Sequence, residues 1–186
     1  MIIVSAITAI ATVVMAMATI KMSKYNKKLS QLQEKQIDLQ QKMRQEQGIN
    51  NLITELEEIS SISSSVSQLT FQIASILGAN TLDYHNINTL YPLLDKMDKR
   101  VYASLKILLI NQILDKTVYE KKVDLINNQS TKINKLLMDP EIISSLEPRK
   151  DIIKMLELYN YIQKDCIVLA TQKIIKCKSN IEQLYQ

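Results

Sequence analysis

The chain has 186 residues, with 23 Lys or Arg, 19 Asp or Glu and one His, so its formal net charge is +4. It contains only two Gly and three Pro, and it has no Trp. So few turn-forming residues argue against a sheet-rich fold, and the composition predicts an all-α protein with long helices packed through Ile and Leu. The length fits one domain plus an appendage.

The positive charge is confined to one segment. Residues 21–47 contain seven basic and three acidic side chains, which accounts for the whole excess, whereas residues 48–186 are balanced. A nucleic-acid-binding domain would carry a basic face of its own. The sequence therefore predicts no nucleic-acid partner.

The first twenty residues contain no charged side chain and no strong helix breaker. A helix of that length spans ~30 Å, the thickness of a bilayer core, so residues 1–20 are predicted to be a transmembrane helix. A basic cluster follows, and it is expected to contact lipid headgroups and to keep the C-terminal domain in the cytoplasm, with the N-terminus outside. The cluster consists of Lys21, Lys24, Lys27 and Lys28.

Two other interpretations of this run stay open. Ala16-Met17-Ala18 resembles a signal-peptidase site, and cleavage there would place a mature chain in the periplasm or outside the cell. Against export, no Lys or Arg precedes the apolar run. The run could also be a buried helix of a soluble bundle, although twenty uncharged residues would be unusual there.

Small residues recur on one face of the apolar helix at alternating spacings of four and three. In a membrane such a face lets helix backbones approach closely, so we expect it to mediate self-association. The alternative is that Ala and Thr are simply common in moderately apolar helices. The face consists of Ser5, Ala9, Thr12, Ala16 and Thr19.

Residues 21–47 are polar and helix-favouring, and they are predicted to form a basic juxtamembrane stalk. Leu29, Leu32, Leu39 and Met43 fit a loose heptad, with the polar Gln36 between them, so the stalk is at best weakly coiled. Gly48 is expected to mark a kink or a break.

A stronger apolar period follows in residues 49–77, where it predicts a helix-packing seam that could also contact a second copy of the chain. The serine-rich stretch 60–67 is read as a solvated face, with a modification site or flexible joint as alternatives. The seam consists of Ile59, Ile62, Val66, Leu69, Ile73 and Ile76.

The remainder of the chain completes a predicted bundle domain over residues 48–186. Gly78 ends the helix in a left-handed conformation, and residues 78–91 are predicted to be a loop. Pro92 is expected to start a helix reaching residue 138, either unbroken or jointed near Asn127-Asn128.

Two further proline signals divide the C-terminal part. Asp139-Pro140-Glu141 resembles a helix start, with a capping acid before a first-turn proline, and opens a short segment ending near Leu146. Pro148 is expected to begin the last helix. Together with residues 49–77, the two long C-terminal segments predict a three-helix bundle with an antiparallel hairpin.

Residue types that carry catalysis are sparse. The single histidine, His85, has no companion motif, no Gly-rich phosphate loop occurs, and the acidic cluster Glu55, Glu57 and Glu58 fits a solvated helix face. Cys166 and Cys177 would lie ~16 Å apart along one helix, too far for a disulfide, and are predicted to be core thiols. We therefore expect no enzyme activity, cofactor, metal or small-molecule substrate.

These observations predict a membrane-anchored, non-enzymatic scaffold, adaptor or assembly subunit. Its partners would be membrane lipid and either another protein or a second copy of the chain. One alternative is an exported helical effector or binding protein, and another is a membrane-active protein whose apolar helices assemble into a pore.

Overall fold

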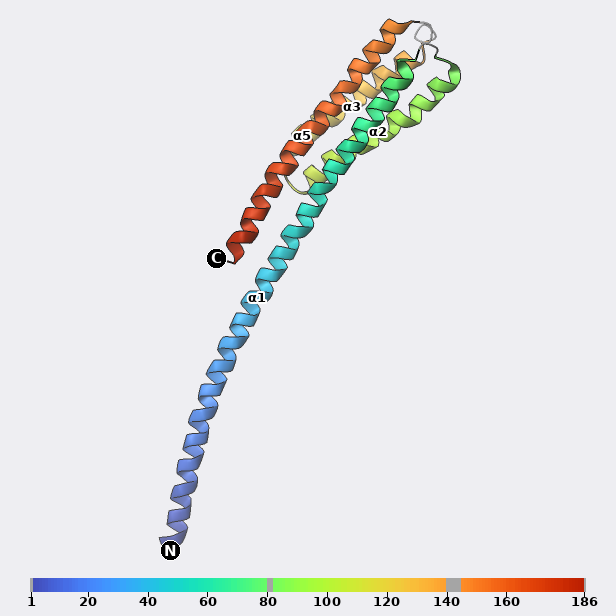
Figure 1. Cartoon of the computed structure of the whole chain (residues 1–186). Helices are drawn as coiled ribbons and strands as arrows, with labels where there is room; N and C mark the ends of the chain where they lie inside the picture. Colours follow the sequence, from blue (N-terminus) through green and yellow to red (C-terminus); the bar gives the residue numbers. More distant parts are fainter. Residues whose placement is uncertain (1, 80–81, 140–144, 186) are drawn as a thin grey trace. The chain divides into compact units, whose positions relative to one another are not determined.

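The computed structural model describes residues 2–79, 82–139 and 145–185, with residues 2–9 and 11 described by their backbone alone. Four helices fill most of these ranges: α1 (Ile2–Leu77), α2 (Tyr84–Ile110), α3 (Lys116–Leu137) and α5 (Leu146–Leu184) (Figure 1). No strand occurs in the ranges described, so the all-α prediction is confirmed.

The chain divides into two compact units, Met1–Gly48 and Ile49–Gln186. The division falls at Gly48, where the sequence predicts a kink or a break, but α1 continues through this residue, so a break between helices is wrong. A side chain at Gly48 would meet nothing within 4 Å, so no close approach of another element requires glycine at this position.

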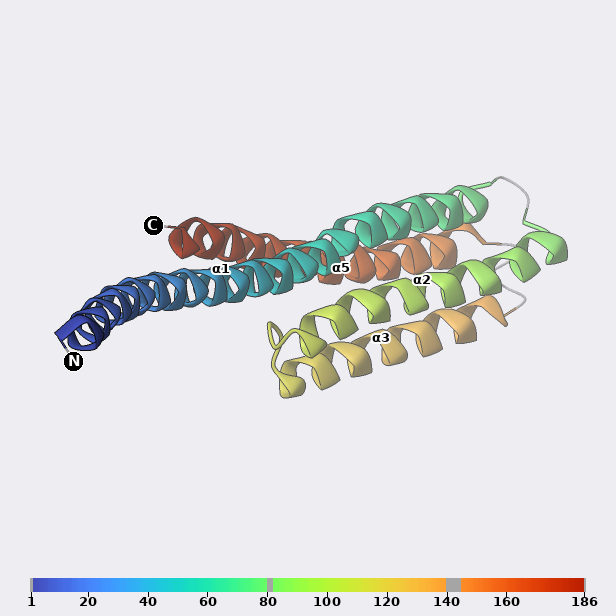
Figure 2. The same cartoon turned by 90° about the horizontal axis from the view of Figure 1, so that it is seen from below.

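The second unit is a bundle of four helices, in which residues 49–77 of α1 share one apolar core with α2, α3 and α5 (Figures 1 and 2). Consecutive helices run antiparallel, which places α2 and α5 in the same direction, and α2 contacts both α3 and α5. Thr70 Oγ1 of α1 lies 3.5 Å from Asn160 Oδ1 of α5. The predicted three-helix bundle is therefore corrected to four helices.

The additional helix arises because the chain turns at residues 111–115 instead of near Asn127-Asn128, which lie inside α3. Gln112 adopts a left-handed φ of 54°, and the side chain of Leu114 is buried. Asp115 then caps α3, its Oδ1 accepting from the Thr117 backbone N–H at 2.7 Å. The turn contains neither Gly nor Pro, so the usual sequence signals are missing.

The predicted loop over residues 78–91 is also too long, because α2 begins at Tyr84. Asp83 caps it by accepting from the Asn86 backbone N–H at 2.7 Å. Pro92 consequently lies inside α2 and not in its first turn. It is exposed, so water can reach the carbonyl that loses its helical donor.

Gly78 does not have the predicted left-handed conformation, since no described glycine has a positive φ. A Cβ at Gly78 would instead lie 3.1 Å from the Ala74 carbonyl oxygen, so space and not backbone conformation favours glycine here. Pro148 lies in the first turn of α5, close to its predicted place. The predicted short segment after Asp139 falls mostly on residues 140–144, outside those described.

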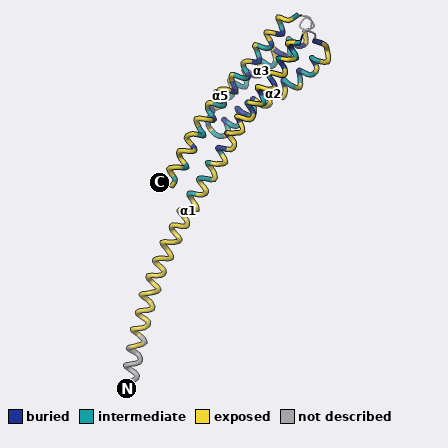
Figure 3. The backbone as a smooth tube through the Cα atoms, viewed as in Figure 1, coloured by how far each residue is buried: buried dark blue, intermediate teal, exposed yellow. Residues whose placement is uncertain are grey.

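The core is a continuous set of apolar side chains drawn from all four helices of the second unit. Figure 3 shows buried positions alternating with exposed ones along each of them. Five residues of the predicted seam are at most 4% exposed, whereas Ile76 is only half-buried and Leu77, at 0%, occupies the core instead. The five are Ile59, Ile62, Val66, Leu69 and Ile73.

Candidate functional site

Residue types that could carry catalysis are dispersed. His85 is exposed in the first turn of α2. Cys166 and Cys177 are free and buried, which confirms the prediction of core thiols. Burial raises the pKa of Cys166 to about 11, so its thiol is protonated and unreactive at neutral pH. Among the described residues, no group of three or more His, Cys, Asp or Glu side chains could hold a metal ion.

A polar cluster lies inside the bundle where α2, α3 and α5 meet. Asp98 of α2 lies beside Ser130 of α3 and Tyr159 of α5, and Tyr159 is fully buried. Burial raises the pKa of Asp98, and the polar groups of Tyr159 and Ser130 oppose that shift. Burial and the nearby Asp98 also raise the pKa of Tyr159. Within the described residues, neither Asp98 Oδ1 nor the Tyr159 hydroxyl has a partner in hydrogen-bond geometry.

A second buried polar contact links α2 to α5. The Ser104 hydroxyl donates to Gln163 Oε1 at 3.1 Å, while Gln163 Nε2 has no partner among the described residues. Nearer the surface, the Tyr102 hydroxyl donates to Asn127 Oδ1 of α3 at 2.6 Å. Because a misplaced helix would leave these groups unpaired, they favour one pairing of α2, α3 and α5 over others.

We expect Asp98→Asn to raise the free energy of unfolding at neutral pH by about 1 kcal/mol, because a neutral amide avoids burying a charge. The folded state holds the Asp98 proton more tightly than the unfolded state does. Protonation of Asp98 therefore stabilises the folded wild-type protein fully below about pH 4. This stabilisation is lost as the pH rises through the raised pKa of Asp98. Urea denaturation over a pH series should show the advantage of the variant shrinking as the solution is acidified.

Asp95→Asn is the matched control for this prediction, because Asp95 lies one turn away, is exposed and pairs with Lys99. Its effect should be small at every pH. A variant of Asp98 that is less stable than the wild type at neutral pH would mean that the carboxylate is stabilised in the cluster.

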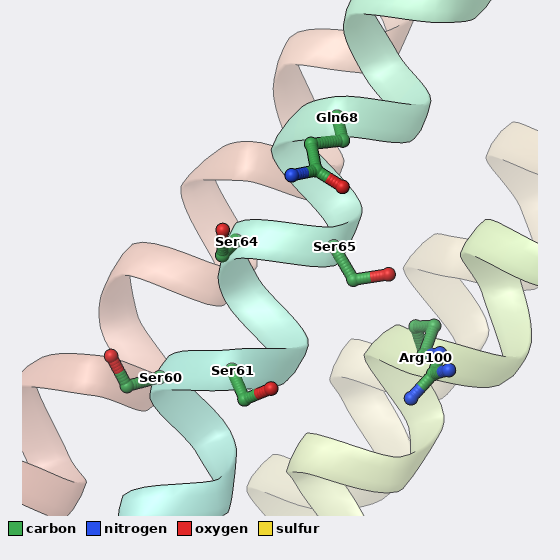
Figure 4. Close-up of a pocket in the computed structure, with 6 residues that line it drawn as sticks. All are labelled: Ser60, Ser61, Ser64, Ser65, Gln68 and Arg100. Carbon is green, nitrogen blue, oxygen red and sulfur yellow. The ribbon is translucent and has the colours of Figure 1, made fainter.

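A shallow hollow of about 500 Å³ lies between α1 and α2 and is lined by Ser60, Ser61, Ser64, Ser65, Gln68 and Arg100. Figure 4 shows Ser61 and Ser65 projecting toward Arg100, with Ser60 and Ser64 on the far side of α1. The lining contains no histidine, lysine or carboxylate to activate a serine, so it offers polar contacts without a nucleophile. Ser60, Ser61 and Ser64 are exposed, as expected for a solvated face.

No protein-family model, curated protein sequence or solved structure is significantly similar to this chain.

The predicted membrane-contacting residues all lie on α1. Lys21, Lys24, Lys27 and Lys28 are exposed, as are Thr12, Ala16 and Thr19. The Thr19 hydroxyl donates to the Met15 carbonyl within its own helix at 2.8 Å. Ser5 and Ala9 lie outside the residues whose side chains are described.

Among the residues described, no helix contains an apolar stretch long enough to cross a membrane. The predicted span of residues 1–20 includes residues 1–9 and 11, whose side chains are not among those described.

The sequence offers residues 49–77, which carry the seam, as one possible contact for a second copy of the chain. The structure fills it with side chains of the same bundle, because α2 and α5 cover this face of α1. Self-association through this seam would require the bundle to open. The sequence does not predict the places of Asp98 and Gln163 in the bundle, since a polar residue within an apolar stripe gives only a weak sequence signal.

Proposed function

We propose that this protein is a non-enzymatic helical scaffold tethered to a membrane by its first twenty residues. The observation that carries the proposal is the uncharged run of residues 1–20, which ends abruptly at a cluster of four lysines. In the described part of this run, large apolar side chains point outward on several sides of α1. They are at least 53% exposed and comprise Ile10, Val13, Val14, Met15, Met17 and Ile20.

Large apolar side chains on several sides of one helix, with no charged residue between them, need an apolar environment, which a bilayer supplies. Lys21, Lys24, Lys27 and Lys28 would then lie at the headgroup level, with each attracting anionic lipid by about 1 kcal/mol. By the positive-inside rule, the lysines that follow the run favour an orientation with the N-terminus outside and the bundle in the cytoplasm.

The proposed mechanism is colocalisation. An anchored bundle is confined to a layer near the membrane, so the effective concentration of anything that it binds rises without any new contact. The bundle buries its apolar seam internally but leaves large apolar side chains such as Phe71, Ile110 and Ile175 exposed on its surface, which suits a carrier of protein contacts.

One specific observation favours a second candidate, an exported helical effector or binding protein. Ala16-Met17-Ala18 would permit cleavage before Thr19 and so leave a chain without the apolar run. A third candidate, a pore assembled from the apolar helices, has only the small-residue face in its favour.

The intact mass of the protein in the membrane and soluble fractions separates these candidates. A full-length mass in the membrane fraction, together with a C-terminal domain that external protease cannot reach, would support the anchored scaffold. A soluble species that begins at Thr19 would overturn it in favour of export. Leakage of the membrane on expression, lost in Ala9→Leu with Ala16→Leu, would indicate the pore.

A further inference from the structure

The stalk between the apolar run and Gly48 exposes an ordered apolar stripe. Its members alternate in steps of three and four residues, so they occupy the a and d positions of a heptad repeat (positions a to g). Ile37 is the one large apolar side chain of residues 22–44 that lies off this stripe. All members are at least 52% exposed: Met22, Tyr25, Leu29, Leu32, Leu39 and Met43.

A shallow, open hollow lies on this stripe. It has a volume of about 250 Å³ and is lined by Tyr25, Asn26, Lys28, Leu29 and Leu32. Of these, Tyr25, Lys28, Leu29 and Leu32 are consecutive d, g, a and d residues. In a coiled coil, four such residues form the hole that accepts a knob from the facing helix.

The residues beside the stripe distinguish the orientation of a facing helix. Every g position is a lysine, namely Lys28, Lys35 and Lys42, and each following e position is a glutamine, namely Gln33, Gln40 and Gln47. In a parallel pair, g faces the e position of the next heptad, so each lysine meets a glutamine. In an antiparallel pair, g faces g, and lysine would repeatedly meet lysine.

The centre of the stripe carries a register signal. Gln36 occupies an a position between Leu32 and Leu39. In a parallel, in-register pair, the two Gln36 side chains lie opposite each other and can form hydrogen bonds. A shifted pair would bury one glutamine against leucine without a partner, and a single polar a residue is a known means of fixing register at some cost in stability.

We infer that residues 22–46 form a parallel, in-register coiled-coil dimer with a second copy of this chain. The occupant of the exposed stripe is thus the same stripe of another molecule. The dimer contact lies outside the bundle, so it leaves the seam of residues 59–76 undisturbed. The inference does not depend on the membrane proposal, because the stripe lies entirely after residue 20.

Variants of the full-length protein that add one cysteine to the stalk test both pairing and orientation in detergent. After mild oxidation, Tyr25→Cys and Met43→Cys should each yield a disulfide-linked dimer on a non-reducing gel, because equivalent a and d residues lie within disulfide reach in a parallel pair. Ile37→Cys is the matched control. It is equally exposed but points away from the pairing face, and should remain monomeric.

The wild-type chain sets the background, since its cysteines, Cys166 and Cys177, are both buried. Dimers that form only when Tyr25→Cys is mixed with Met43→Cys would indicate an antiparallel pair and overturn the inference. Absence of linked dimers at both positions, or equal linkage at Ile37→Cys, would also overturn it. Unchanged helicity of each variant by circular dichroism would show that the bundle is folded.

Charge substitutions beside the stripe provide a second measurement. Gln40→Glu would face the Lys35 of the partner molecule and should lower the dimer dissociation constant about threefold, whereas Gln40→Lys should raise it by a similar factor. Sedimentation equilibrium in detergent measures both, and neither variant alters the apolar stripe. If the two substitutions changed the dimer dissociation constant in the same direction by the same factor, parallel pairing would be contradicted.

Discussion

Leu77→Ala is expected to lower the free energy of unfolding of the bundle by about 3 kcal/mol. The Leu77 side chain is fully buried at the end of α1, so its truncation removes apolar contacts and leaves a cavity among well-packed neighbours. The neighbouring Ile76→Ala should cost only about 1 kcal/mol, because Ile76 is half-buried and water can fill the space. Chemical denaturation of the two variants, followed by far-ultraviolet circular dichroism, measures the difference.

The two substitutions form a matched pair, since they remove similar volumes from adjacent positions of one helix. Equal losses, or a larger loss at Ile76, would indicate that the end of α1 is rotated by one residue relative to the core. The comparison thus decides whether Ile76, as the predicted seam has it, or Leu77, as the structure has it, lies in the core at the end of α1.

Ile10→Lys should move the protein from the membrane fraction to the soluble fraction. A lysine near the centre of a membrane-spanning helix costs roughly 2.5–3.5 kcal/mol, which corresponds to about a hundredfold change in partition. Ile10 is the central residue of the run 1–20, where neither end of the helix is within easy reach of a lysine side chain. Extraction of isolated membranes at alkaline pH, with the protein measured in the pellet and supernatant, gives the partition.

Gln31→Lys adds the same charge within the stalk and should leave the partition unchanged. A wild-type chain that is already released by alkaline extraction would contradict the anchor, and so would an Ile10→Lys variant that stays in the pellet. Because both variants leave residues 49–186 intact, a change in partition cannot be attributed to unfolding of the bundle.

An anchored chain that also dimerises through its stalk would display two bundles side by side at one membrane surface. A partner with two binding sites would then be held more tightly than by either bundle alone, provided that the spacing permits both contacts. Loss of dimerisation in the full-length protein should therefore lower its affinity for a partner with two binding sites more than its affinity for a partner with one.

Several elements of the bundle could be predicted because their signals are local. The apolar period of residues 59–73 identifies one buried face, and Pro148 marks the start of α5 within a turn. The burial of Cys166 and Cys177 followed from their place among Leu and Ile on one face of a helix. In each case neighbouring residues on one helix carry the information.

The elements that were missed depend on contacts between distant residues. The turn at residues 111–115 has no Gly or Pro, and it forms because Leu114 inserts into the core and Asp115 caps α3. Pro92 resembles a helix start, but the Asp83 cap and the burial of Leu90 and Leu94 keep both sides of it helical. Tertiary packing overrode the local preference at both places.

The sequence by itself determined the all-helical class, the uncharged N-terminal run, the basic stalk and the face that α1 buries, because these properties repeat along one helix. Only the tertiary structure decided that four helices form the bundle, that Leu77 replaces Ile76 in the core, and that Asp98 and Tyr159 meet inside it. The physical reason is that helical periodicity specifies which residues share a face. Whether the residues on that face are buried, by contrast, depends on which other helix packs against the face and on the residue at which that second helix ends.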